Sequence, residues 1–124
     1  MHNQPSVSEM VQAVKNFIDD TAAPKLTGRA AFHARVASNT LATILRDLEA
    51  RAGNEAAEST RLQELLGANE ETRLDQLNRD LCARIKSGEM DTDTPGLLAH
   101  LKATTIAQIE VDQPGYSGLK SAKT

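Results

Sequence analysis

The sequence predicts an all-α protein, a single-domain helical bundle of about five helices. Its 124 residues fit one domain comfortably. Apolar residues recur at helical spacing, and no segment alternates apolar and polar residues as a strand would. Aromatic residues make up only 2% of the chain, so the core must be aliphatic, which suits helices packed on helices. We expect one domain over residues 1–124, with its core at 5–112 and a tail at 113–124 that frays or docks loosely.

The first helix is expected over residues 6–21. Ser6 followed by Glu9 fits a capping box, in which each side chain accepts a hydrogen bond from a free backbone N–H of the first turn. Pro24 then ends the element. Its apolar stripe consists of Val7, Met10, Val11, Val14, Phe17 and Ile18.

The next segment predicts two helices separated by a glycine. A long helix is expected over residues 28–52, closed by Gly53 as its C-cap. A shorter helix follows over 55–66, with Gly67 at its end.

Two further helices complete the predicted bundle. One spans residues 72–87 and stops at Gly88. The last begins with Thr94 as N-cap and Pro95 at the first helical position, where its missing N–H costs nothing. It runs to about residue 111.

Composition and charge exclude several classes of function. The net charge is −3, from 14 basic and 17 acidic residues, which argues against non-specific nucleic-acid binding. No apolar run approaches the ~20 residues of a membrane span. The single cysteine, Cys82, cannot form an internal disulfide, and residues 1–10 do not resemble a secretory signal. We therefore expect a cytoplasmic protein that binds neither nucleic acid nor membrane.

Residues 28–39, GRAAFHARVASN, place hydrogen-bond donors among apolar residues. Phe32 and Val36 point almost opposite to the main apolar face of this helix, so we expect its first half to be covered on both sides. Buried donors must find acceptors. The residues in question are Arg29, His33, Arg35 and Asn39.

Two interpretations of these donors remain open. With His100, from the equally apolar last helix, they form a binding site for an anionic ligand between the two helices, since arginine suits carboxylate and phosphate. Alternatively they form an internal network that holds the helices in register. The acidic partners would then be Asp19, Asp20, Asp47 and Asp112.

The sequence contains no recognisable catalytic or metal-binding motif. No HExxH, paired CxxC or Glu-x-x-His pattern is present, so neither metal nor cofactor is expected. An enzyme would have to use His33 or His100 as its acid or base. Nothing in the sequence orients either side chain, and we expect no catalytic activity.

Several segments resemble an uncharacterised family of bacterial all-helical domains. The most specific is GRxxFHxRVAxN at residues 28–39, and Leu97-Leu98 with Leu101, Asp112-Gln113-Pro114 and Tyr116 match more weakly. The resemblance covers roughly residues 5–119. Members of that family occur beside phosphotransferases of the aminoglycoside-kinase and choline-kinase type and beside acyl-CoA dehydrogenases. The resemblance implies an accessory role in that setting and supplies no catalytic residues.

Two functions follow as expectations. The first is a non-catalytic accessory or interaction module that assists a phosphotransferase or acyl-CoA dehydrogenase, or that forms a homodimer. It predicts an exposed apolar patch or a self-complementary dimer face. The second is a small-molecule binding domain for an anionic ligand, built on the donors named above.

Overall fold

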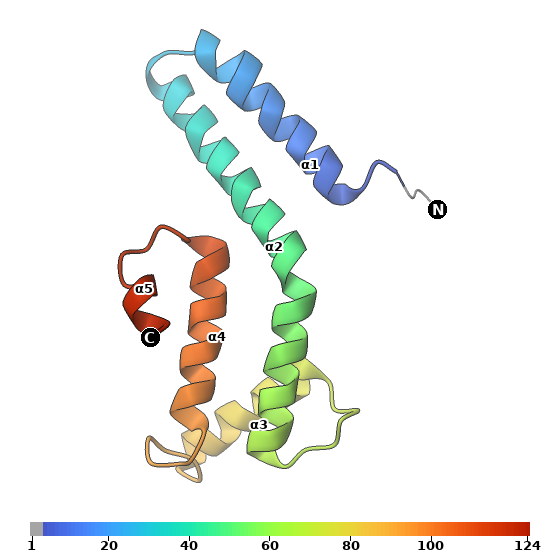
Figure 1. Cartoon of the computed structure of the whole chain (residues 1–124), viewed down its shortest axis with the longest axis vertical. Helices are drawn as coiled ribbons and strands as arrows, with labels where there is room; N and C mark the ends of the chain where they lie inside the picture. Colours follow the sequence, from blue (N-terminus) through green and yellow to red (C-terminus); the bar gives the residue numbers. More distant parts are fainter. Residues whose placement is uncertain (1–3) are drawn as a thin grey trace. The chain divides into compact units, whose positions relative to one another are not determined.

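The computed structural model describes residues 4–124, and every regular element in them is helical, which confirms the predicted class. The chain divides into two compact units, residues 1–50 and 51–124. One long helix, α2 (Gly28–Leu66), belongs partly to each unit (Figure 1).

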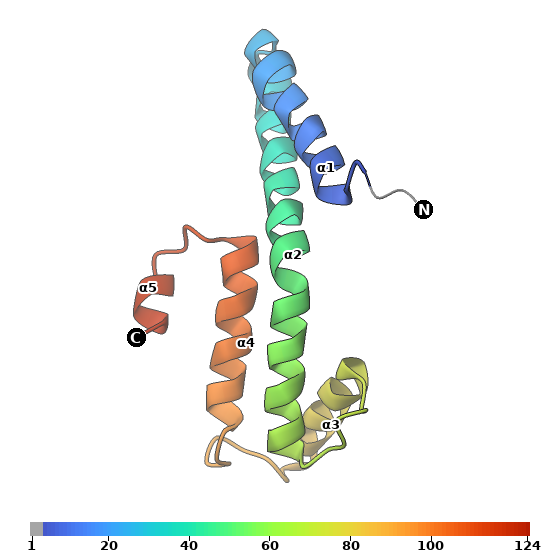
Figure 2. The same cartoon turned by 45° about the vertical axis from the view of Figure 1, so that its right-hand side comes forward.

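The first unit is a helical hairpin. Helix α1 (Val7–Asn16) continues through a π-helical turn, Phe17–Ala22, and a 3-10 turn, Ala23–Lys25. The first part of α2 then returns antiparallel beside α1, as both views show (Figures 1 and 2). Pro24 lies in the 3-10 turn, where the first helical arm ends.

The predicted capping box starts α1. The Ser6 backbone N–H donates to Glu9 Oε2 at 2.6 Å, and the Glu9 N–H donates to Ser6 Oγ at 3.2 Å. Two free donors of the first turn are satisfied in this way. These hydrogen bonds hold the pKa of the Glu9 carboxyl below its usual range, the backbone bond at Ser6 contributing most.

The expected break at Gly53 is wrong, because α2 runs without interruption from Gly28 to Leu66. Gly53 does not have the positive φ of a C-cap glycine, whereas Gly67, directly after the helix, has φ 63°. An interior glycine costs about 1 kcal/mol relative to alanine, and the strong helix formers around it outweigh that amount. The two helices expected at 28–52 and 55–66 are therefore one.

The second unit surrounds a core of leucines. Helix α3 (Leu74–Ser87), ending at Gly88 as expected, and helix α4 (Leu97–Asp112) pack with the second part of α2. The buried core cluster consists of Leu62, Leu66, Leu77, Leu81, Met90 and Leu97. Asn78 Nδ2 of α3 donates to Glu58 Oε1 of α2 at 3.0 Å and fixes these two helices together.

The start of the last long helix differs from expectation. Thr94 does not cap α4. Its Oγ1 accepts from the Asp91 N–H at 2.9 Å inside the preceding turn, and Gly96 (φ 88°) is the N-cap instead. In the tail, a short helix, α5 (Leu119–Ala122), buries Leu119 and lies against α4.

Candidate functional site

The predicted cluster of donors on α2 lies at the surface of the hairpin. Arg29, His33, Arg35 and Asn39 are all exposed. The expectation that this half of the helix is covered on both sides is wrong, because within the first unit only the α1 arm packs against it and the opposite side, with Phe32 and Val36, stays open. His100 belongs to the second unit and is buried.

The side chains of this cluster do not form the alternative internal network either. Within residues 4–124, the guanidinium groups of Arg29 and Arg35 make no hydrogen bond or ion pair. His33 meets the ring of Phe32, with centroids 5.8 Å apart. Whether these side chains bind an anion stays a prediction.

The polar contact that ties the hairpin together is centred on Asp19. Lys15 Nζ lies 2.6 Å from Asp19 Oδ2, and the buried Ser38 of α2 donates its hydroxyl to Asp19 Oδ1. The hydrogen bond from Lys15, then that from Ser38, holds the pKa of the Asp19 carboxyl below its usual range. Asp19 therefore pairs with Lys15 and Ser38.

Acid is expected to weaken the hairpin through Asp19. Because the pKa is lowered in the folded state, the unfolded chain binds more protons at low pH. The stabilisation is complete above the ordinary value near 3.8 and is lost as the pH falls through the lowered folded value. Asp19→Asn should abolish this part of the acid dependence. NMR of the Ser38 signals, and in the wild type also of the Asp19 signals, measures how the hairpin loses stability as the pH falls. Asp20→Asn removes the same charge one residue later and should leave it intact.

Six exposed apolar side chains of the hairpin form what we call the hairpin face. In α1 and the turn after it they are spaced as one helical stripe, and in α2 they are one turn apart. The hairpin face consists of Val7, Met10, Val14, Phe17, Ile44 and Leu48.

The two helices present these residues on the same side of the hairpin. In α1 the stripe is displaced by roughly 70° from Val11 and Ile18, which α2 partly covers, at 100° per residue. In α2, Ile44 and Leu48 are displaced in the same rotational sense from the buried Ser38. Since the helices are antiparallel, equal displacements place both stripes on one side. The hairpin face is thus a single apolar surface.

The hairpin has no buried apolar core of its own. Ser38 is its one buried residue within 4–50, and every large apolar side chain there is at least partly exposed. The second unit, in contrast, buries Leu62 and Leu77 completely. Two helices cannot enclose a core between them, and the apolar side chains of this hairpin stay open to water.

The second unit contains a small open pocket of about 350 Å³ between α2 and the start of α4. Its wall is lined by Arg61, Glu64, Leu65, Pro95, Gly96, Ala99 and His100. The sequence predicted a pocket between the helix expected at 28–52 and the last helix, whereas the α2 residues of this pocket lie in the segment expected as a separate helix at 55–66. Of the residues proposed for it only His100 lines it, and the arginine is Arg61.

Two nitrogens of the pocket residues are buried without a partner in residues 4–124: Arg61 Nε and His100 Nδ1. Another nitrogen of the guanidinium, Arg61 Nη2, donates to Thr104 Oγ1 at 3.2 Å and fixes its position. Burial, and then the charge of Arg61, lower the pKa of His100, against a smaller opposing effect of Glu58. The net effect favours the neutral form of the His100 imidazole.

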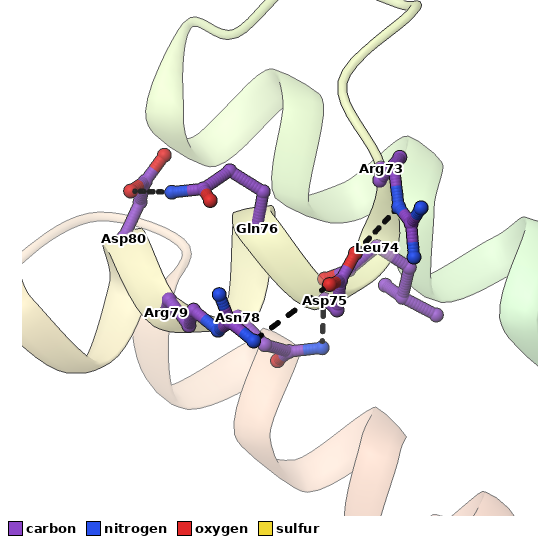
Figure 3. Close-up of polar contacts among 7 residues, drawn as sticks. All are labelled: Arg73, Leu74, Asp75, Gln76, Asn78, Arg79 and Asp80. Carbon is purple, nitrogen blue, oxygen red and sulfur yellow. Dashed lines mark hydrogen bonds and ion pairs between the residues drawn. The ribbon is translucent and has the colours of Figure 1, made fainter.

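The charged residues of α3 satisfy one another locally (Figure 3). Arg73 Nε donates to Asp75 Oδ1 at 3.0 Å, and Gln76 Nε2 donates to Asp80 Oδ1 at 2.9 Å. Arg79 Nη2 lies 3.9 Å from Asp75 Oδ2. These are pairs along a solvated helix surface, so this dense polar cluster is no candidate site.

Over residues 4–124, no three histidine, cysteine or acidic side chains gather as metal ligands would. Over the same residues, none of the helices combines the length and apolar character needed to cross a membrane.

The fold and its two surface features define an all-helical protein made of a hairpin with an open apolar face and a second unit with a small pocket. The chain belongs to the family described as Domain of unknown function (DUF6285), whose model matches residues 24–116. This confirms the expected membership of an uncharacterised domain family. Comparisons with curated proteins and with solved structures found no match.

Proposed function

We propose that the protein is a non-catalytic interaction module, and that its hairpin face binds the hairpin face of a second copy. The observation that supports this most is the hairpin without a buried apolar core, which leaves residues such as Val14 and Phe17 open to water. Monomeric proteins rarely expose contiguous apolar patches of this kind unless they bind a partner.

A second copy fits this surface in shape and in chemistry. Two antiparallel hairpins stacked face to face make a four-helix bundle, in which each stripe becomes part of a shared core. None of the six side chains of the hairpin face carries a charge, so a like surface can cover it without burying an unpaired charge. The contact is self-complementary, as a two-fold axis requires.

The area available is enough for a reversible dimer. Helix α1 with its following turn covers residues 7–22, and two helices side by side over that length measure roughly 20 Å by 24 Å. Two such faces bury on the order of 1,000 Å², which is at the lower end of specific interfaces. We therefore expect a dissociation constant in the micromolar range.

A different protein on the hairpin face is the competing occupant. The family resemblance points to a phosphotransferase or an acyl-CoA dehydrogenase for that role, and the lone Cys82 supports a reducing, cytoplasmic setting. If a second copy covers the hairpin face, such a partner must compete with dimer formation for that face. Otherwise it must bind the outer sides of the dimer.

Sedimentation equilibrium of the full chain at about 1 to 300 µM tests the proposal, because the range brackets the expected dissociation constant. The mass should rise from 13.4 kDa towards twice that value as the concentration increases. A mass that stays at 13.4 kDa throughout contradicts the second copy as occupant. If that monomer instead forms a stoichiometric complex with a phosphotransferase or a dehydrogenase, the interaction module stands and its partner is a different protein.

A further inference from the structure

The pocket of the second unit combines one cationic side, one apolar side and one acidic edge. Arg61 contributes the cation, and Leu65, Pro95 and Ala99 contribute the apolar surface. Glu64 stands at the edge and is exposed. A volume of about 350 Å³ suits a small organic molecule.

Three sets of polar groups at this pocket lack a side-chain partner. Arg61 Nε is buried and unpartnered, and so is Nδ1 of His100, a residue that is 3% exposed. No side chain caps the amino end of α4, where the N-cap is Gly96. A helix amino end attracts negative charge through its free N–H groups. An anion bound in this pocket would meet the Arg61 guanidinium and the free N–H groups at the amino end of α4.

We propose that this pocket binds a small monocarboxylate with a short apolar body, its carboxylate between Arg61 and the amino end of α4. One guanidinium and one helix end balance a single negative charge. The exposed carboxylate of Glu64 would repel a dianionic phosphate more strongly than a monoanion. The apolar wall of the pocket can pack against the apolar body of the ligand. Inorganic phosphate has no apolar part that could make this contact.

The pKa of His100 is expected to change when an anion occupies the pocket. In the free protein, burial and the charge of Arg61 keep its pKa low, while Glu58 acts weakly in the opposite sense. A bound carboxylate adds a negative charge beside Arg61 and raises that pKa. Glu64 lies at the same pocket and is present in both states, so it does not account for the change.

The test is a titration of the full-length protein with butanoate, with butanamide as the uncharged isostere and with inorganic phosphate, all at equal ionic strength. For so small a ligand we expect a dissociation constant on the order of 1 mM. Butanoate should shift the NMR signals of the His100 ring, identified with His100→Gln, and should raise its pKa. Butanamide should do neither. An equal response to the amide, or a tighter one to phosphate, overturns the assignment of a monocarboxylate.

Four variants separate binding from folding. Arg61→Gln should abolish the response, and Ala99→Leu should also abolish it by filling the pocket from an exposed position that leaves Arg61 in place. Glu64→Gln should strengthen butanoate binding about two- to fivefold, since it removes a repulsive charge. Arg79→Gln, an exposed arginine of α3 outside the pocket, should change nothing. Failure of wild-type protein to respond to butanoate, or unchanged binding in both Ala99→Leu and Glu64→Gln, overturns the proposal.

Discussion

Phe17→Ser is expected to abolish self-association at concentrations where the wild-type protein is dimeric. Phe17 is 60% exposed in a single chain and lies at one end of the hairpin face. Burying a phenylalanine side chain at the interface contributes about 1.5–3 kcal/mol to the free energy of association. In a two-fold dimer the substitution is present in both copies, so this contribution is lost twice. The dissociation constant should therefore rise by roughly 10²- to 10⁴-fold. Sedimentation equilibrium measures this shift.

Phe32→Ser is the matched control for this prediction. Phe32 is 57% exposed, almost the same as Phe17, but it lies on the side of α2 opposite to its contact with α1 and outside the hairpin face. The same substitution there should leave the dissociation constant within about threefold of wild type, or roughly 0.6 kcal/mol. If the two variants weaken association equally, general hydrophobicity and not the hairpin face drives it.

Leu77→Ala should be the most destabilising single substitution in the second unit. Leu77 of α3 is fully buried in the leucine core between α3 and the second part of α2. Truncating such a side chain removes its transfer free energy and leaves a cavity, and costs about 2–5 kcal/mol of unfolding free energy. Urea denaturation followed by circular dichroism gives this value from the displaced midpoint.

Leu98→Ala provides the comparison within the same unit. Leu98 is 55% exposed on α4, so its truncation should change the free energy of unfolding by about 0.5 kcal/mol or less. An equal effect of the two substitutions would contradict the packing of the leucine core. Leu77→Ala should also leave the hairpin face unaltered, since that face belongs to the first unit.

Local signals in the sequence were sufficient for the helical class and for some boundaries. The capping box of Ser6 and Glu9 acts within one turn, so its residues can be identified without the rest of the chain. Gly88 ends α3 for an equally local reason, its positive φ of 81°. Gly53 shows the limit of such signals, because a glycine ends a helix only if the chain turns away after it, and here it does not.

The candidate sites depended on contacts that no local pattern contains. The apolar and cationic stretch around Arg35 predicted a central helix, but a helix is central only if other elements cover it, and in the hairpin one side stays open. Arg61 lies in a charged helix segment, where no local pattern distinguishes it from a solvated arginine. Its position beside His100 results from α2 and α4 coming together across 39 residues of sequence. His100 lies on an apolar helix, where a histidine tends to be buried, and the structure buries it.

The hairpin face as the dimer contact is tested most directly by isotope-filtered NMR on an equimolar mixture of ¹³C-labelled and unlabelled protein. Nuclear Overhauser effects between labelled and unlabelled copies arise only from side chains that touch across the interface. We expect them from the methyl groups of Met10, Val14 and Leu48, which lie on the hairpin face. Intermolecular signals confined to Val36, on the opposite side of α2, or none at a concentration where dimers are present, would contradict the account.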